Sequence, residues 1–160
     1  MNEFDPLAIL GRLVEGDVDF VIIGGLAATI HGAAIPTRDL DVMYDREPAN
    51  LERLAAVLAG LSVRLRGAED VPLRVDARLL RNGDRFTFTT PFGDIDILAT
   101  ADGAASYGDV RERAQLLDIG PYRVRVASLD DLIDMKRGAN RPKDEPKLAE
   151  LLELRDLTDS

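Results

Sequence analysis

The segment Thr37-Arg38-Asp39-Leu40-Asp41 constrains this chain more than any other, because it joins a strand-like pattern to two closely spaced carboxylates. Side chains alternate between the faces of a strand, so Asp39 and Asp41 would project to one side while Leu40 enters a core. Neighbouring carboxylates repel each other unless a cation lies between them, and such oxygen pairs suit Mg²⁺. The alternative is the polar face of an exposed strand, which is disfavoured because two aspartates on one face destabilise a strand.

A glycine turn precedes this strand. The apolar run Phe20–Ile23 is typical of a buried strand, and Gly24-Gly25 then turns the chain into a small-residue helix over residues 26–30. A turn of this kind can bring backbone N–H groups against phosphates. Together, the glycine turn and the paired aspartates indicate an enzyme that handles a metal–nucleotide complex.

A third carboxylate is expected from a later hairpin. Residues 85–89 alternate polar and apolar, residues 91–93 read as a turn, and residues 94–98 alternate again, so the two runs predict an antiparallel pair. Asp94 and Asp96 repeat the spacing of the first pair. We prefer Asp96, which lies deeper in the apolar run, and interpret Asp94 as a solvated neighbour. Three carboxylates can hold two Mg²⁺ ions about 4 Å apart, the arrangement used in phosphoryl transfer.

The remaining pattern predicts one α+β domain over residues 1–160, with a core at about 18–127 and a helical C-terminal part at about 128–158. Helices are expected at about 6–15, 48–58 and 76–80, from Ser128 onward, and at 144–157, with a short strand at 62–66. A second hairpin is expected over 116–126 around Gly120-Pro121.

Composition excludes several classes of protein. The 160 residues contain no cysteine, so disulfides and thiolate metal sites are excluded. No apolar run is long enough for a membrane span, and the N-terminus lacks the pattern of a signal peptide, so we expect a cytoplasmic protein. The net charge of −9 argues against general polyanion binding but allows a local basic patch.

With Gly24-Gly25, Asp39-x-Asp41 and the later Asp96, the chain resembles the DNA polymerase β-like nucleotidyltransferase superfamily. The C-terminal segment Lys136-x4-Arg141-x-Lys143-Asp144 is similar to that of small bacterial nucleotidyltransferases of the AbiEii type, including MenT-like toxins. The resemblance covers about residues 18–155. It implies a small mixed sheet that carries the acidic residues, with helices packed on it and a helical C-terminal end.

The resemblance also implies transfer of a nucleoside monophosphate from an NTP to an acceptor hydroxyl, with release of pyrophosphate. In the toxin branch the acceptor is the tRNA 3′ end, and a cognate antitoxin protein is a possible partner. Asp39, Asp41 and Asp96 would hold Mg²⁺ (or Mn²⁺), and Asp96 would help to deprotonate the acceptor. The phosphate and nucleotide side would be formed by Gly24, Gly25, Thr37, Lys136 and Asp144.

Basic residues near the C-terminus could contact acceptor phosphates. They are Arg137, Arg141, Lys143 and Lys147, and a solvated helical face is the equally weighted alternative. Arg123 and Arg125 could extend this patch. Read without the resemblance, Lys136 could simply favour a helix C-terminus through the helix dipole.

Structural roles are expected for three other polar residues near the motifs. Thr37 is expected to hydrogen-bond the turn in preference to a phosphate, and Arg38 to point away from the aspartates toward surface carboxylates. His31, the single histidine, is expected to make a helix-end or loop hydrogen bond.

Two competing functions follow from the same residues. The chemistry could act on a protein or small-molecule hydroxyl, or the chain could be a non-catalytic nucleotide-binding or partner-binding module. The triple aspartate argues against the last, because a decayed site has no physical reason to keep like charges together.

Overall fold

One mixed sheet organises the computed structural model, which describes residues 3–34 and 36–158. Seven strands, counted within those residues, follow the order β3-β4-β5-β2-β1-β7-β6. They are β1 (Phe20–Ile23), β2 (Asp39–Tyr44), β3 (Arg64–Leu65), β4 (Arg85–Thr90), β5 (Gly93–Leu98), β6 (Gln115–Ile119) and β7 (Tyr122–Val126). The pairs β2–β5 and β1–β7 are parallel, and the other neighbours are antiparallel. The mixed sheet and both hairpins expected from the sequence are confirmed.

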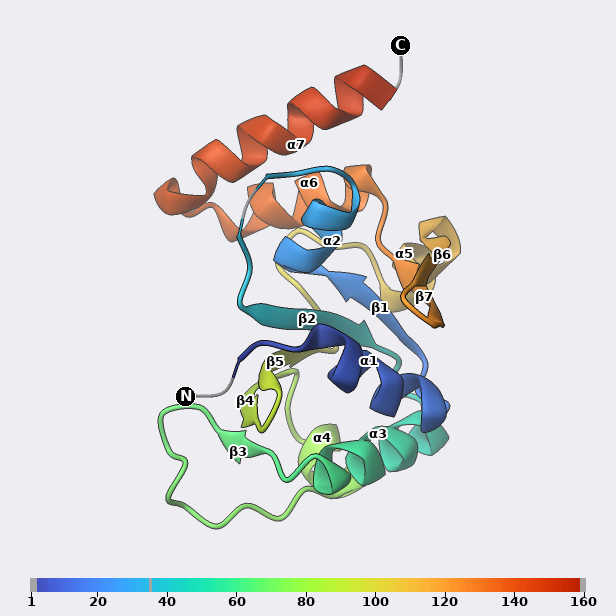
Figure 1. Cartoon of the computed structure of the whole chain (residues 1–160), viewed down its shortest axis with the longest axis vertical. Helices are drawn as coiled ribbons and strands as arrows, with labels where there is room; N and C mark the ends of the chain where they lie inside the picture. Colours follow the sequence, from blue (N-terminus) through green and yellow to red (C-terminus); the bar gives the residue numbers. More distant parts are fainter. Residues whose placement is uncertain (1–2, 35, 159–160) are drawn as a thin grey trace.

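Helices lie on both sides of the strands (Figure 1). α1 and α3 lie on one side, and α2, α6 and α7 stack on the other, with α7 outermost. The helices are α1 (Pro6–Glu15), α2 (Gly24–Ile30), α3 (Pro48–Gly60), α4 (Ala77–Arg81), α5 (Tyr107–Arg113), α6 (Leu129–Ala139) and α7 (Glu145–Thr158), and a 3₁₀ turn, η1 (Pro142–Asp144), joins the last two. None of the helices in the described residues has the length and apolar character needed to cross a bilayer.

Side-chain caps mark the starts of α1 and α6. Asp5 accepts a hydrogen bond from the N–H of Ala8 at 3.2 Å, and Pro6 occupies the first helical position of α1. At α6, the Ser128 hydroxyl accepts from the N–H of Asp131 at 3.1 Å. The buried Asp131 carboxylate is in turn held by Arg113 at 2.7 Å. These caps fix where α6, which carries Lys136, begins.

The core explains the direction of the aspartates on β2. All four residues of β1 are buried, and in β2 the side chains of Leu40 and Val42 are fully buried while Asp39 and Asp41 are only partly covered. This alternation is the one expected from the sequence. Burial of the apolar face fixes the strand register, because a slip by one residue would place the aspartates in the core.

The strand expected over residues 62–66 is shorter in the structure. β3 contains only Arg64 and Leu65. Ser62 has a φ of 54° and Gly67 a φ of 85°, so the backbone leaves the extended region on both sides. The short β3 nevertheless places the next residue, Arg66, beside the acidic strands.

Candidate active site

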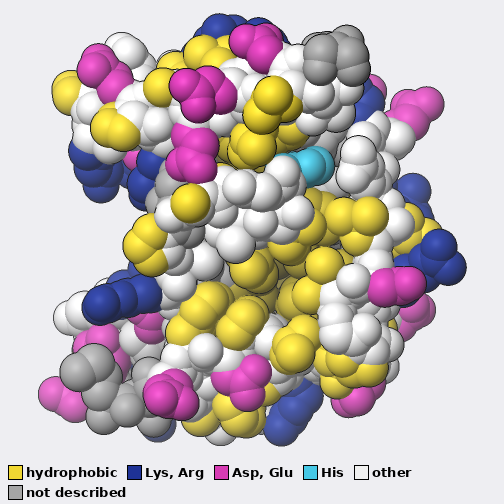
Figure 2. All heavy atoms as spheres, turned by 45° about the horizontal axis from the view of Figure 1, so that its top comes forward, with side chains coloured by type: hydrophobic (Ala, Val, Ile, Leu, Met, Phe, Trp, Pro, Cys, Tyr) yellow, Lys and Arg dark blue, Asp and Glu magenta, His cyan; other side chains and the backbone are white. Residues whose placement is uncertain are grey.

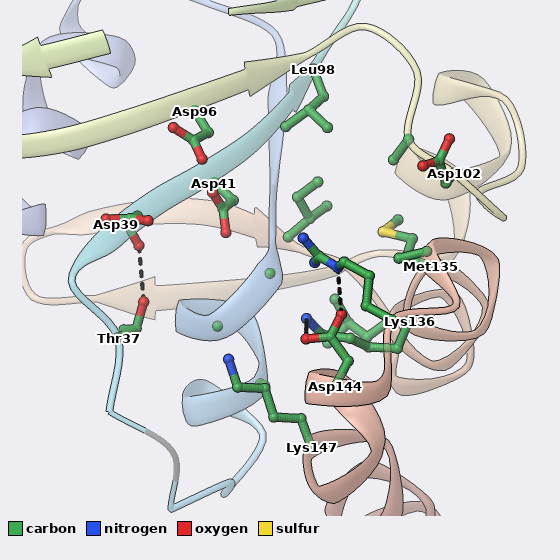
Figure 3. A pocket seen from close by; sticks show the side chains of 18 of the residues that line it. Thr37, Asp39, Asp41, Asp96, Leu98, Asp102, Met135, Lys136, Asp144 and Lys147 are labelled. Atoms are coloured by element: carbon green, nitrogen blue, oxygen red, sulfur yellow. Dashed lines mark hydrogen bonds and ion pairs between the residues drawn. The ribbon is translucent and has the colours of Figure 1, made fainter. Parts of the chain in front are cut away.

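Aspartates from the adjacent parallel strands β2 and β5 lie side by side in the sheet. In the register of β2 and β5, Asp39 lies opposite Asp94 and Asp41 opposite Asp96. Asp39, Asp41 and Asp96 line a cavity of about 620 Å³, and their carboxylates lie together on one of its sides (Figure 3). Asp94 is not among the lining residues, and its side chain is 35% exposed against 14% for Asp96.

Crowding of these carboxylates perturbs their ionisation. Burial, together with the charges of Asp96 and Asp39, raises the pKa of Asp41 to about 7. Burial and the charge of Asp96 also raise the pKa of Asp39, although the nearby Arg66 counteracts part of the effect. A cation placed among the three carboxylates would remove this repulsion.

The glycine pair, expected as a turn before a helix at residues 26–30, forms the first two residues of α2 and lies against Asp41. Gly24 has a φ of 71°, and a Cβ built there would collide with the Asp41 carboxylate. A Cβ on Gly25 would lie 3.0 Å from the hydroxyl of Thr37. Both positions therefore have little room for a side chain, and both line the cavity. The Thr37 hydroxyl donates to the carbonyl of Asp39, the first residue of β2, at 3.1 Å.

Lys136 and Asp144 meet on the side of the cavity opposite the carboxylates (Figure 3). Lys136 Nζ lies 3.5 Å from Asp144 Oδ1, and Arg141 Nε donates to Asp144 Oδ2 at 2.8 Å. Burial opposes ionisation of the 5% exposed Asp144, but the hydrogen bond from Arg141 and the charge of Lys136 outweigh it and lower its pKa. Burial also lowers the pKa of Lys136. Asp144 thus fixes the lysine ammonium at the cavity wall.

The predicted basic patch is divided by the structure. Arg141, Lys143 and Lys147 line the same cavity as the aspartates, whereas Arg137 lines an adjoining hollow of about 220 Å³. Figure 2 shows a notch in the outline of the molecule with Lys and Arg side chains on both edges. Arg123 and Arg125 lie on β7, near the other end of the sheet, and neither lines the cavity. The suggestion that they extend the patch was therefore wrong.

Two residues near the turn differ in how well the sequence placed them. His31 Nε2 lies 2.8 Å from the carbonyl oxygen of Ala127, in agreement with a helix-end hydrogen bond. Arg38 lines the cavity, and the described part of the chain contains no ion pair for it. Strand alternation does not govern its direction, because β2 begins only at Asp39.

Arg66 is the principal site residue that the sequence did not suggest. Its Nη2 donates to Asp96 Oδ1 at 2.7 Å, and its Nε lies 3.2 Å from Asp94 Oδ2. Arg85 and Asp102 also line the cavity without having been expected there. A lone arginine after an irregular stretch carries no local pattern, and only tertiary pairing of β3 with β4 brings Arg66 to the acidic strands.

The donor chemistry of the cavity fits a hard divalent cation. Among residues 3–34 and 36–158, no three acidic or histidine side chains already surround one point closely enough to form a complete ligand set. Asp39, Asp41 and Asp96 nevertheless supply the carboxylate oxygens that Mg²⁺ prefers, in the number typical of a site completed by water and substrate phosphates. Burial and the charges of Asp96 and Asp39 raise the pKa of Asp41, and a cation would offset the part that comes from these charges.

Comparisons of sequence give little information on activity. No family model matches the chain. A UPF0102 protein of Rhodopseudomonas palustris (strain BisA53) is 34% identical over 90 residues, which is 54% of this chain. The match covers 62% of that relative, so the chain spans less than two thirds of its length.

Comparisons of structure are more informative. The crystal structure of ANT(2″)-Ia in complex with adenylyl-2″-tobramycin has a TM-score of 0.59 at 19% identity, covering 95% of this chain and 86% of that one. The solution structure of the same antibiotic-resistance factor also gives 0.59, at 20% identity and with 95% and 80% covered. A Thermotoga maritima protein provisionally assigned as a nucleotidyltransferase gives 0.58 at 13% identity, with 95% and 96% covered. The chain therefore has the nucleotidyltransferase-type α+β fold that its sequence predicts.

Proposed function

We propose that this protein is a Mg²⁺-dependent nucleotidyltransferase that moves a nucleoside monophosphate from an NTP to a hydroxyl of an RNA acceptor. The observation that carries the proposal is the division of one cavity into two walls. Asp39, Asp41 and Asp96 form one wall, and Lys136 with neighbouring basic side chains forms the other. A triphosphate with its metal ions needs both kinds of wall.

In this proposal the carboxylates organise the reacting groups. Asp39 and Asp41 hold the cation together with the triphosphate, and Asp96 accepts the proton of the attacking hydroxyl. Bound Mg²⁺ supplies charge neutralisation of the phosphates and a lower pKa for that hydroxyl. The acceptor oxygen bonds to the α-phosphorus as the bond to the bridging oxygen breaks, and pyrophosphate leaves.

The opposite wall binds the leaving group. Lys136, held by Asp144 at 3.5 Å, places its ammonium toward the phosphates. Gly24 and Gly25 have no side chains and leave the backbone at the start of α2 open to the triphosphate. Thr37 lies beside Gly25, and its hydroxyl donates to the carbonyl of Asp39. Cationic side chains on a departing pyrophosphate stabilise the charge that develops during transfer.

The acceptor is inferred from the charge around the cavity. Although the chain has a net charge of −9, Arg141, Lys143 and Lys147 line the cavity, and we call these three residues the basic rim. ANT(2″)-Ia was solved with an adenylylated aminoglycoside, and an aminoglycoside is a polycation that a basic rim would repel. A polyanion such as RNA fits this rim better. In its specific form, the proposal is that the acceptor is the tRNA 3′ end and that the protein is a cytoplasmic toxin with a cognate antitoxin. The similarity of the Lys136–Asp144 segment to that of the toxin branch supports this form.

The direct test is incubation of the protein with each α-³²P-labelled NTP, Mg²⁺ and total RNA, followed by gel analysis. We expect one NTP to label RNA, with tRNA as the main product. Wild-type labelling equal to that of Asp41→Asn would refute the proposal. Asp118→Asn, a change at an exposed aspartate on β6, is the matched control and should keep full activity.

The likeness to ANT(2″)-Ia favours a second candidate, which is nucleotidylation of a small-molecule hydroxyl. The same assay distinguishes it, since label would then appear in small molecules of an extract and not in RNA. A protein product would support the related protein-acceptor alternative. Binding of Mg–NTP in calorimetry without any pyrophosphate release would instead identify a non-catalytic module.

The basic rim should control acceptor affinity. We expect Lys143→Ala/Lys147→Ala to raise the KM for RNA, and to reduce the slope of log K against log salt by about 2, because each phosphate contact contributes about 1. The KM for NTP should change little. Arg123→Ala/Arg125→Ala removes the same charge on β7, outside the cavity, and should leave the KM for RNA near the wild-type value. Equal effects of the two double variants would show that only net charge matters.

A further inference from the structure

Arg66 reaches two aspartates from the edge of the sheet. β3 pairs with β4, with Leu65 opposite Phe88, and the N–H of Arg66 donates to the carbonyl of Thr87 at 3.0 Å. From this anchored backbone the guanidinium extends over β4 to β5. Nη2 donates to Asp96 Oδ1 at 2.7 Å and to the carbonyl of Phe88 at 3.1 Å.

The two carboxylates are not bound equally. Asp96 receives a short hydrogen bond of 2.7 Å. Asp94 Oδ2 lies 3.2 Å from Arg66 Nε, but the Nε–H is buried and makes no hydrogen bond. Rotation of the guanidinium toward Asp94 would give this Nε–H a partner. A second position for the guanidinium therefore exists at Asp94, two residues before Asp96 on β5.

A divalent cation in the cavity would compete with Arg66 for Asp96. The guanidinium occupies one oxygen of the third carboxylate, and its positive charge lies beside the place where the cation would bind. A carboxylate can contact two cations, but the guanidinium and a divalent ion on Asp96 would repel each other and each would weaken the binding of the other. Either the guanidinium moves, or the cation binds weakly.

We propose that Arg66 neutralises Asp96 in the metal-free protein and transfers to Asp94 when a divalent cation binds, so that the Arg66–Asp94 pair controls metal loading of the site. This inference rests on the proposed function. It makes Arg66 and Asp94 positioning residues, which act through Asp96 and touch neither substrate nor metal. It also gives Asp94, which does not line the cavity, a role in the site.

Binding of Mn²⁺, followed by the electron paramagnetic resonance signal of the free ion, tests this exchange without any measurement of activity. We expect Arg66→Gln to bind Mn²⁺ about tenfold more tightly, because a competing charge at contact distance is removed in a partly screened site. Asp94→Asn should weaken binding, because Arg66 then has no second position and stays on Asp96. Arg66→Lys, which keeps the charge, should remain close to wild type.

The decisive comparison is a double-mutant cycle. If Arg66 transfers to Asp94, adding Asp94→Asn to the Arg66→Gln variant should have little effect on Mn²⁺ affinity. If Asp94→Asn weakens binding by the same factor in both backgrounds, Asp94 acts only through its charge and the exchange is refuted. An unchanged affinity in Arg66→Gln would refute it as well.

Control variants separate this inference from the proposed function. Arg46→Gln breaks the Arg46–Asp84 ion pair of 3.1 Å outside the cavity, and should not change Mn²⁺ binding. Loss of Mn²⁺ binding in Asp41→Asn localises the ion to the cavity. If the protein transfers nucleotides but the two substitutions act additively on Mn²⁺ affinity, only the exchange of Arg66 is refuted. If the substitutions are coupled as expected but no nucleotide is transferred, the exchange stands and the proposed activity is refuted. Thermal unfolding of each variant confirms that it is folded.

Discussion

Replacing Asp41 with Asn should abolish nucleotide transfer while making the metal-free protein more stable. Asn keeps the shape of the side chain but removes the charge of the proposed metal ligand. We expect kcat/KM to fall about a thousandfold, because a catalytic metal contributes several kcal/mol and each 1.4 kcal/mol is a factor of ten. Initial rates of pyrophosphate release at saturating Mg²⁺ measure the loss, with Asp118→Asn as the control.

The gain in stability follows from the raised pKa of Asp41. Burial and the charges of Asp96 and Asp39 raise this pKa to about 7, whereas an unfolded chain titrates aspartate at about 3.9. Between about pH 4 and pH 7 the folded protein therefore holds a proton that the unfolded chain releases, so this group makes the metal-free protein less stable as pH rises.

Urea unfolding across pH, in the presence of a chelator, measures this effect. At pH 8 the variant should exceed the wild type in free energy of unfolding by about 4 kcal/mol, since the two pKa values differ by about 3 units, and near pH 4 the difference should be small. Saturating Mg²⁺ should reduce the difference, since the cation stabilises only the wild type at this position. A variant that is less stable than the wild type at pH 8 would contradict the interpretation that ionised Asp41 destabilises the metal-free protein.

The second large effect is expected from a single methyl group at Gly24. Its φ of 71° is unfavourable for alanine, and the added Cβ would collide with the Asp41 carboxylate. We expect Gly24→Ala to lower the free energy of unfolding by about 1–2 kcal/mol from the backbone alone. Transfer should fall about a hundredfold, because displacing a reacting group by about 1 Å has an effect of that size.

Gly108 offers the matched control. It lies in α5, and a Cβ built there meets nothing within 4 Å. Gly108→Ala should therefore leave transfer unchanged and raise stability slightly, because alanine is the better helix former. If Gly24→Ala retained full activity, the close approach of the turn to Asp41 would have no functional importance.

Local patterns were sufficient to predict much of this molecule. Alternation along β2 and β5 placed Asp39, Asp41 and Asp96 on one face, because the side-chain period of a strand is fixed whatever its partners are. The sequence also brought Lys136 and Asp144 into one segment, and the structure joins them at 3.5 Å. The strand signals also predicted the two hairpins, whereas the mixed sheet was implied by the resemblance to the nucleotidyltransferase superfamily.

Other parts of the site depend on tertiary pairing and were missed for that reason. Arg66 reaches Asp96 only because the short β3 pairs with β4, and no periodicity marks a strand of this length. The positions of Arg123 and Arg125 depend on strand order, which places β7 away from β2 and which sequence spacing does not reveal.

The parallel pairing of β2 with β5 also determines when the site can exist during synthesis of the chain. Asp41 meets Asp96 only after β5 has emerged, and Lys136 with Asp144 follows later still. A parallel pair cannot close through a tight hairpin, and domains emerge from the ribosome with their N-terminus first. An incomplete nascent chain therefore lacks an assembled site. If the proposed acceptor is tRNA, this order would keep the chain inactive until most of it has been translated.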